Sequence, residues 1–258
     1  MKKICAVVLG LSLAGLAAAD AKGDAVAQKY FDLKKADDTR SSAVMTLIDK
    51  AGTKKTRKLE IFYQEGAEGK NAFMNFLEPA DVAGTKFLTL SHRGSEAEQR
   101  LYLPALKKTR KISSASQNGE FVNSDFYFFD LADKTFDDYT FTFIEDNLTI
   151  ADKAFEGMKF AKIEMKAKDP TTPYVKEVAY VNMDNNFVYK LECFDRKDNA
   201  LLKTFLFVKV DSIKGILVPV QTMVTNNKKG SKTLLALTDP QINSGVGKDV
   251  FTVQNLEK

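Results

Sequence analysis

The chain of 258 residues contains one histidine and two cysteines, so few side chains are available for nucleophilic or metal chemistry. The histidine, His92, lies in the polar segment SHRGSEAEQR between two apolar runs. A catalytic or metal-binding histidine needs a partner at suitable geometry, and the sequence offers neither a second histidine nor a nearby cysteine. The pattern therefore favours a surface loop for His92.

Cys193 lies in an alternating run, on the same side as Tyr189 and Leu191. A buried thiol behaves as a small hydrophobe, and a reactive thiol needs a neighbour that lowers its pKa. No such neighbour stands beside Cys193, which favours a place in the core. No Gly-rich phosphate loop, G-x-S-x-G, H-E-x-x-H or C-x-x-C motif occurs. We therefore expect a protein that is not an enzyme; an exported hydrolase is the weakest alternative.

Acidic residues gather near the middle of the chain, at Asp125, Asp130, Asp133, Asp137 and Asp138. Calcium loops need acidic side chains at tight spacing with a glycine at the sharp turn, and no D-x-D-x-D-G pattern occurs here. Helix caps or a solvated face explain these residues better. We expect neither a metal site nor a cofactor.

A basic run, Lys107, Lys108, Arg110 and Lys111, follows an alternating strand. It could contact lipid headgroups or an acidic partner, since each charge near an anionic membrane surface contributes about 1 kcal/mol. It could equally be a solvated edge strand whose lysines discourage aggregation. Both interpretations stay open.

The N-terminus has the parts of an export signal. Lys2 and Lys3 precede an apolar run, and three consecutive alanines ending at Ala19 fit the small-residue cleavage rule. We expect residues 1–19 to be a signal peptide, with cleavage after Ala21 as the second choice. Removing two lysines lowers the formal charge of +4 further, which leaves too little basic bias for nucleic-acid binding.

The rest of the chain alternates mainly with a period of two. Residues 24–35 are the first exception, an amphipathic helix with Asp24 as its N-cap. Alternating runs separated by turn residues then predict about ten to twelve antiparallel strands, in one domain over residues 20–258. Such a pattern is typical of a meander curled into a barrel or half-barrel. Residues 124–134, SDFYFFDLADK, predict a short helix capped by Ser124 or Asp125. We expect this helix and the N-terminal helix to lie across the open mouth of the sheet.

A set of short motifs runs through the chain in a fixed order. They are FLEP from Phe76, GTKFL from Gly84, LYLPAL from Leu101, RKI from Arg110, Phe121, SDF from Ser124, DL from Asp130, PY at Pro173 and FTVQNLE from Phe251. In this order they resemble the outer-membrane lipoprotein-sorting family, which comprises periplasmic proteins related to the lipoprotein carrier LolA. The chain departs from the family where a Trp commonly precedes Leu-Tyr-Leu-Pro, since Arg100 stands there.

The resemblance implies an incomplete, half-open antiparallel β-barrel of about 11 strands, whose concave face is covered by helices. It implies a periplasmic carrier in a Gram-negative bacterium that binds acyl chains of lipoproteins or other lipids and shuttles them toward the outer membrane. The implied partners are an inner-membrane transporter of the resistance–nodulation–division (RND) type and an outer-membrane acceptor. The alternative is a periplasmic sensor or adaptor that binds lipid or peptide and regulates a membrane partner.

From the pattern alone, a core packed with the chain's own side chains and a lipid cavity are equally consistent. The resemblance favours the cavity, an apolar hollow that the chain leaves vacant under a loosely packed lid without strong polar anchors. Its predicted lining comprises Leu59, Ile61, Phe87, Leu101, Leu103, Phe126, Phe129, Leu131, Ile163, Met165, Leu191 and Leu206.

Overall fold

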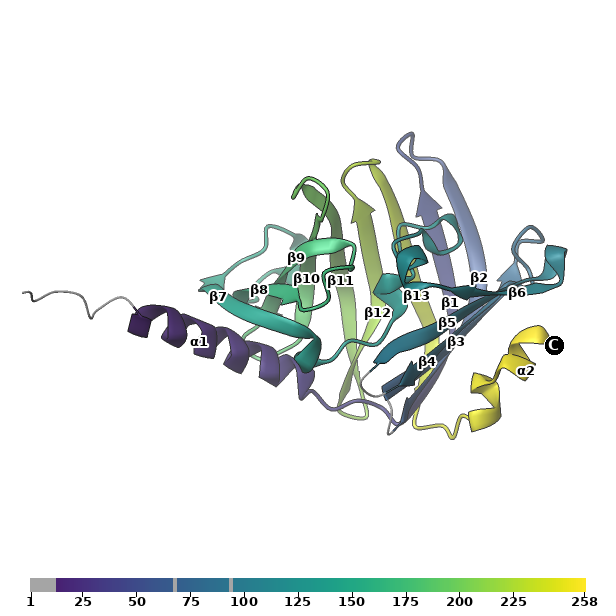
Figure 1. Cartoon of the computed structure of the whole chain (residues 1–258), viewed down its shortest axis with the longest axis horizontal. Helices are drawn as coiled ribbons and strands as arrows, with labels where there is room; N and C mark the ends of the chain where they lie inside the picture. The colour runs from purple at the N-terminus through teal and green to yellow at the C-terminus, as the bar shows by residue number, and fades with distance from the viewer. Residues whose placement is uncertain (1–12, 67–68, 93–94) are drawn as a thin grey trace, which may run out of the picture.

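One continuous, curved antiparallel sheet dominates the part of the chain that the structure describes (Figure 1). The structure is a computed structural model, and it describes residues 13–66, 69–92 and 95–258. The strand order is β6-β5-β4-β3-β2-β1-β13-β12-β11-β10-β9-β8-β7. The chain thus starts at the centre of the sheet, winds out to one edge at β6, restarts at the opposite edge with β7, and returns until β13 pairs with β1.

The strands of the described residues have the following bounds. They are β1 (Asp38–Ile48), β2 (Lys54–Gly66), β3 (Gly69–Glu78), β4 (Lys86–His92), β5 (Ser95–Leu103), β6 (Lys108–Ile112), β7 (Tyr139–Leu148), β8 (Phe160–Ala167), β9 (Tyr174–Asn182), β10 (Val188–Asp195), β11 (Leu201–Ile213), β12 (Ile216–Asn226) and β13 (Ser231–Ile242).

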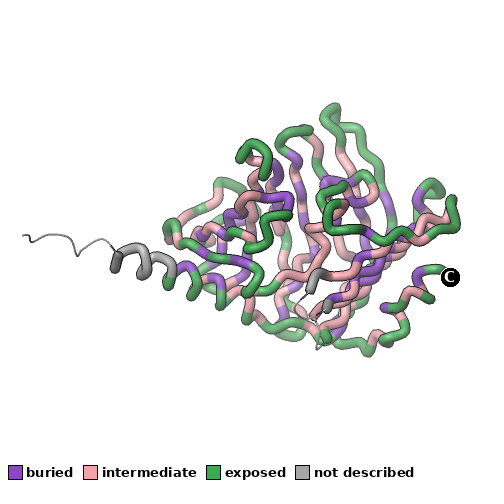
Figure 2. The backbone as a smooth tube through the Cα atoms, viewed as in Figure 1, coloured by how far each residue is buried: buried purple, intermediate pink, exposed green. Residues whose placement is uncertain are grey.

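Period-two alternation gives this sheet its apolar concave face. Ile61 lies opposite Met74, Met74 opposite Phe87, and Phe87 opposite Leu101, so apolar side chains form a row across β2 to β5. All four are at most 9% exposed, and buried positions recur along the strands (Figure 2). Register is fixed by this burial, because a shift of one residue would turn every side chain to the other face.

The prediction of an antiparallel, mainly β fold is confirmed, but the estimate of about eleven strands is too low. Thirteen strands occur among the described residues. The turn between β11 and β12 consists of Lys214 and Gly215, both with positive φ. This conformation suits a two-residue hairpin turn, and a lysine in that position is not a turn signal that sequence reasoning recognises.

Helix α1 (Leu13–Phe31) packs against the edge strand β7, where Ala27 is fully buried beside Phe141 and Ile163. The predicted helix therefore exists, but Asp24 lies inside it and is not its N-cap. Both candidate cleavage positions, after Ala19 and after Ala21, fall within α1.

The C-terminal segment covers the convex face at the other side of the molecule. Phe251 and Leu256, the latter in α2 (Val253–Glu257), pack on Phe73 and Leu88, which alternate with the concave residues of β3 and β4 (Figure 1). In the described part of the chain, no helix has the length and apolar character needed to cross a membrane.

Gly23 allows α1 to approach the backbone of β7. A Cβ atom at this position would lie 2.8 Å from the backbone nitrogen of Phe143. In an exposed helix Gly→Ala stabilises by about 1 kcal/mol. Here we expect Gly23→Ala to lower the free energy of unfolding instead, by about 1–3 kcal/mol, because backbone cannot move away cheaply. Urea unfolding measures this difference.

Ala25 is exposed on the same helix and provides the matched control. Ala25→Gly should cost about 1 kcal/mol through helix propensity alone. If Gly23→Ala stabilises the protein, α1 does not pack on β7 as described.

Candidate functional site

The connection from β6 to β7, residues 113–138, runs across the concave face and is called the lid from here on. It contains only 3₁₀ turns, namely η2 (Ser114–Ser116), η3 (Phe121–Asn123), η4 (Phe129–Leu131) and η5 (Phe136–Asp138). Its central backbone hydrogen bonds are internal: the Phe121 N–H donates to the Phe126 carbonyl at 2.8 Å, and the Phe128 N–H donates to Gly119 at 3.1 Å. The lid is therefore a small folded unit of its own.

The predicted helix over residues 124–134 is wrong. Ser124 is extended, and only the short turn η4 follows. A helix would send four consecutive aromatic side chains to all sides, whereas here Tyr127 forms an isolated β-bridge with Glu120, and Phe126 and Phe128 both enter the core cluster. Both of these rings are buried, at 6% and 8% exposure. Burial of alternate rings against the sheet thus overrides the helical pattern.

Aromatic rings of the lid fill the concave face beneath it. Phe121 is fully buried, with its ring centroid 5.0 Å from that of Phe87. Phe128 lies 5.6 Å from Phe87, and Phe126 lies 6.0 Å from Phe205 on β11. The expected vacant hollow under the lid is therefore occupied by the chain's own side chains in this structure.

A buried ion pair holds the centre of the lid. The Lys203 ammonium of β11 donates to Asp130 at 3.0 Å, and the two side chains are 0% and 3% exposed. The other oxygen of Asp130 accepts from the Tyr174 hydroxyl at 2.6 Å, and the Tyr127 N–H completes the set at 2.7 Å. The expectation of a lid without strong polar anchors is wrong, and Asp130 is neither a helix cap nor solvated.

Burial and the neighbouring carboxylate decide the protonation of this cluster. Burial lowers the pKa of Lys203, although Asp130 opposes the shift. Burial, together with Asp130, raises the pKa of Tyr174 well above its usual value, so its hydroxyl stays protonated and donates. The Lys203 ammonium also lies 3.0 Å from the centre of the Tyr127 ring, an additional attraction for a desolvated cation.

A second charged pair lies beside the first. Lys134 of the lid approaches Glu177 of β9 at 3.8 Å, and Glu177 is 4% exposed. Burial lowers the pKa of Lys134, but the carboxylates of Glu177 and Asp130 outweigh it and hold the pKa above its usual value. Cys193 is fully buried 3.9 Å from Glu177. Burial, followed by Glu177, raises the pKa of its thiol well above normal. The prediction of a core cysteine is confirmed.

Further side-chain anchors tie the lid to the sheet. Asp125 accepts the Thr233 hydroxyl at 2.7 Å, and its backbone N–H donates back to the same hydroxyl at 3.0 Å. The Gln99 amide of β5 donates to the Phe128 carbonyl at 2.8 Å, and Arg57 of β2 donates to the Val122 carbonyl. In all of these contacts, at least one partner is a side chain.

Three buried side-chain oxygens lack a hydrogen-bond partner among the described residues: the hydroxyls of Ser41 and Thr89 and the amide oxygen of Gln99. Each residue is at most 3% exposed, and Thr89 pairs directly with Gln99 across β4 and β5. Unsatisfied buried groups are rare and costly, so each of them calls for an explanation.

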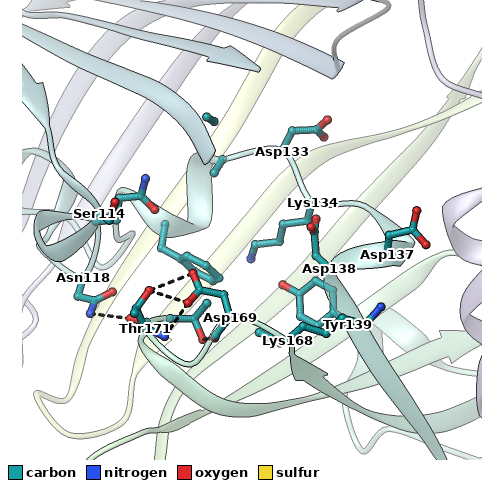
Figure 3. A pocket seen from close by; sticks show the side chains of 16 residues that line it. Ser114, Asn118, Asp133, Lys134, Asp137, Asp138, Tyr139, Lys168, Asp169 and Thr171 are labelled. Carbon is teal, nitrogen blue, oxygen red and sulfur yellow. Dashed lines mark hydrogen bonds between the residues drawn. The ribbon is translucent and has the colours of Figure 1, made fainter. Parts of the chain in front are cut away.

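Two hollows flank the lid. The first, of about 340 Å³, lies between Phe129, Lys134, Tyr139 and the turn before β9, and Lys134 extends into it over the Phe129 ring (Figure 3). The second, of about 440 Å³, lies between the lid and the β5–β6 edge, with Leu101 and Arg110 on its wall. Pockets that bind small molecules commonly measure 300–1,000 Å³.

The structure brings most of the predicted lining residues together. The sheet residues Leu59, Ile61, Phe87 and Leu101 and the lid residue Phe126 belong to the buried cluster under the lid. Partly buried side chains pack against that cluster; these are Leu103, Phe129, Leu131 and Leu191. Two others, Ile163 and Met165, belong to the neighbouring cluster under α1, which Leu191 also contacts.

The face assigned to Leu206 is wrong. Its cross-strand partners are Lys190 and Met223, and it packs in a separate cluster around Phe160. Phe205 takes the concave position beside Phe126. The sequence pattern of β11 is ambiguous because both alternating sets of this strand contain large apolar residues.

The basic run Lys107, Lys108, Arg110 and Lys111 lies exposed on and beside the edge strand β6. This placement suits both interpretations of the run. The side chain of His92 lies outside the described residues.

Sequence reasoning missed the polar residues of the concave face, above all Lys203 and Glu177. A signal for them exists: Cys193 aligns with both Glu177 and Lys203 across three strands. The cross-strand neighbours of an inward-facing residue also face inward, so a charged neighbour needs a buried partner from another part of the chain. Without the strand register, that alignment cannot be read from the sequence.

Comparison with known proteins identifies the family. Residues 68–258 match a family model that carries the description "Uncharacterized protein". A crystal structure from Vibrio parahaemolyticus that carries the name outer membrane lipoprotein-sorting protein domain is 28% identical, with a TM-score of 0.85, over 93% of this chain and 100% of that one. The chain therefore belongs to the family of this model, and its structure matches that of an outer-membrane lipoprotein-sorting protein domain. No curated protein matches the sequence.

Two further crystal structures are similar. A DUF1329 family protein from Desulfovibrio piger is 25% identical, with a TM-score of 0.84 over 92% of this chain and 99% of that one. A LolA superfamily protein from Nitrosomonas europaea is 18% identical, with a TM-score of 0.66 over 93% and 98%. The latter supports the LolA-like fold alone.

Removal of one partner of the buried pair tests its role in the lid. Lys203→Met leaves the Asp130 carboxylate buried without its counter-ion, so we expect a loss of about 3–5 kcal/mol in the free energy of unfolding. The double variant Lys203→Met/Asp130→Asn should recover part of that loss. Denaturant unfolding of the single and double variants measures both.

Lys228→Met provides the matched control, since this half-exposed lysine pairs with Asp195 and Asp198 at the surface. It should cost less than about 1 kcal/mol. Equal losses in Lys203→Met and Lys228→Met would contradict a buried anchor.

Proposed function

We propose that this LolA-like protein is a periplasmic carrier that binds acyl chains of lipoproteins or other lipids and moves them toward the outer membrane. Residues 1–19 act as the signal peptide, and residues 20–258 form the lipid-binding domain. An RND-type transporter of the inner membrane supplies the cargo, and an outer-membrane acceptor receives it. The protein needs no cofactor and has no catalytic role in this process.

The observation that carries the proposal is the way the lid is attached. Between residues 117 and 131, its backbone hydrogen bonds are internal, and its contacts with the sheet involve side chains. The lid can therefore leave without breaking a strand pairing. Its departure exposes a continuous apolar face that includes Ile61, Phe87 and Leu101. In this proposal the aromatic rings of the lid occupy the apolar face of the sheet when no acyl chain is bound.

The energies of lid and cargo are comparable. A chain of roughly 16 methylenes gains about 13 kcal/mol from complete burial. The rings of Phe121, Phe126 and Phe128 gain about 1.5–3 kcal/mol each, and the polar anchors add to this. Because burial of the lid and burial of the acyl chain contribute similar free energies, one can replace the other reversibly. A carrier needs this reversibility in order to release its cargo.

The unsatisfied oxygens support a ligand with polar as well as apolar parts. Gln99 and Thr89 lie side by side under the lid with free hydrogen-bonding capacity. Lid departure also releases the Gln99 amide from Phe128. The ester or amide groups of a lipid could then pair with them, whereas a pure hydrocarbon could not.

Co-purification tests the carrier directly. We expect protein isolated from a bacterial envelope to carry lipid or acylated peptide, detected by native mass spectrometry. The delipidated protein should bind a fluorescent fatty acid. A mass without adducts, together with no fatty-acid binding, would exclude a lipid carrier; binding to a membrane protein that persists without lipid would favour the sensor or adaptor.

Cys193 provides a reporter for lid opening. It lies fully buried under the lid, and its raised pKa slows thiolate formation further. In the mature chain, where Cys193 is the one cysteine, we expect slow labelling by a thiol reagent, accelerated at least about tenfold when a fatty acid displaces the lid. Asp130→Asn, which weakens the anchor, should accelerate labelling without ligand. The control Asp137→Asn changes an exposed lid residue and should have no effect. Unchanged labelling in saturating ligand would contradict displacement of the lid.

A further inference from the structure

Exposed lysines gather along one rim of the sheet. The strand register places the β1–β2 and β12–β13 turns together, since Ile48 pairs with both Lys54 and Lys232. The β5–β6 turn lies at the same end of its strands, where Leu103 pairs with Lys108. This rim runs along the top and right of the molecule in Figure 1. Among the described residues of this rim, the exposed lysines without an ion-pair partner are called the basic rim from here on; they are Lys50, Lys54, Lys55, Lys107, Lys108 and Lys232.

Two acidic side chains near these turns, Asp49 and Glu78, are already engaged. Asp49 accepts the N–H groups of Ala51 and Thr53 in its own turn. Glu78 pairs with Lys58 at 2.9 Å. The opposite end of the sheet is balanced instead, for example in the segment between β7 and β8, where Asp152 and Glu156 accompany Lys153 and Lys159. The basic rim thus carries a local excess of positive charge.

A large apolar side chain projects from this basic rim. Leu106 is 62% exposed in the β5–β6 turn, in η1 (Pro104–Leu106). The following residue, Lys107, adopts a left-handed conformation with φ of 46°. Leu106 is therefore held at the apex of the turn, with Lys107 and Lys108 directly after it.

We propose that the basic rim docks this protein on an anionic lipid bilayer, with Leu106 inserted at the level of the headgroups. Stable but reversible membrane association needs two signals, an apolar insertion and a basic patch. The rim supplies both. This inference rests on the proposed function in one respect. The hollow beside Arg110 lies near the same edge of the sheet, so docking would bring this hollow, where cargo would enter, close to the membrane.

The chemistry of the rim favours a bilayer over an acidic protein partner. Its charges are lysines, which are compact, strongly hydrated point charges on flexible stems. They are spread over three turns and are not gathered around a shaped groove. A fluid anionic surface accepts such a distribution, whereas a protein partner would need carboxylates at matching positions.

Vesicle co-sedimentation tests the docking. The full mature chain should bind phosphatidylcholine vesicles that contain phosphatidylglycerol and should not bind pure phosphatidylcholine. Binding should weaken as salt screens the charges. Lys107→Glu/Lys108→Glu should reduce binding by at least about tenfold, given the contribution of each charge near an anionic surface. Leu106→Ser should reduce it less and leave the salt dependence unchanged.

Lys153→Glu/Lys159→Glu is the matched control, because it changes net charge equally at exposed positions of the opposite end. Equal loss of binding in both pairs would overturn the proposal, as would equal binding of the wild type to both kinds of vesicle. The proposal would also be overturned if Lys107→Glu/Lys108→Glu bound vesicles as well as the wild type but no longer bound an acidic protein. Fatty-acid binding is measured in parallel in solution without vesicles. If the wild type does not bind fatty acid, the carrier proposal fails. If it binds fatty acid but does not bind anionic vesicles, only the docking proposal fails.

Discussion

Strands β6 and β7 follow each other in the chain but form opposite edges of the sheet, and this constraint shapes the whole molecule. Residues 113–138 must cross the full width of the concave face to connect them. A crossing segment cannot add to strand pairing, so it satisfies its backbone internally, as Phe121 does with Phe126. The topology therefore generates a lid that is covalently tethered at both ends and attached to the sheet by side chains.

The polar anchors give this lid a defined position. Apolar contact alone would allow aromatic rings to slide over a smooth sheet, since the hydrophobic effect is not directional. Asp130, with Lys203, Tyr174 and the Tyr127 N–H, fixes one point, and Asp125 with Thr233 fixes another. A buried pair adds little net stability because of its desolvation cost. Its role here is therefore best described as selection of one docked arrangement.

Sequence patterns predicted the parts of this molecule that depend on local periodicity. The concave faces of β2 and β8 could be read from alternation at Leu59 and Ile163, because the other side of each strand is mostly polar. On β11 both sides are apolar, and the choice of Leu206 over Phe205 failed for that reason. The lid failed for a different one: its conformation depends on partners such as Lys203, far away in the sequence. No local pattern reports contacts of that range.

The same desolvation that weakens the anchors as a source of stability makes them suitable for a lid that opens. While the lid is closed, Lys203 and Asp130 lack water, and only their mutual contact and the hydroxyl of Tyr174 compensate. When the lid lifts, both charges regain hydration, which offsets much of the lost attraction. The aromatic rings lose their burial at the same moment, but an incoming acyl chain replaces them on the sheet. Opening without cargo is thus costly mainly through the rings, and opening with cargo is nearly balanced. A lid anchored by buried charges and rings together is consequently closed when empty and displaceable when a sufficiently long apolar chain arrives.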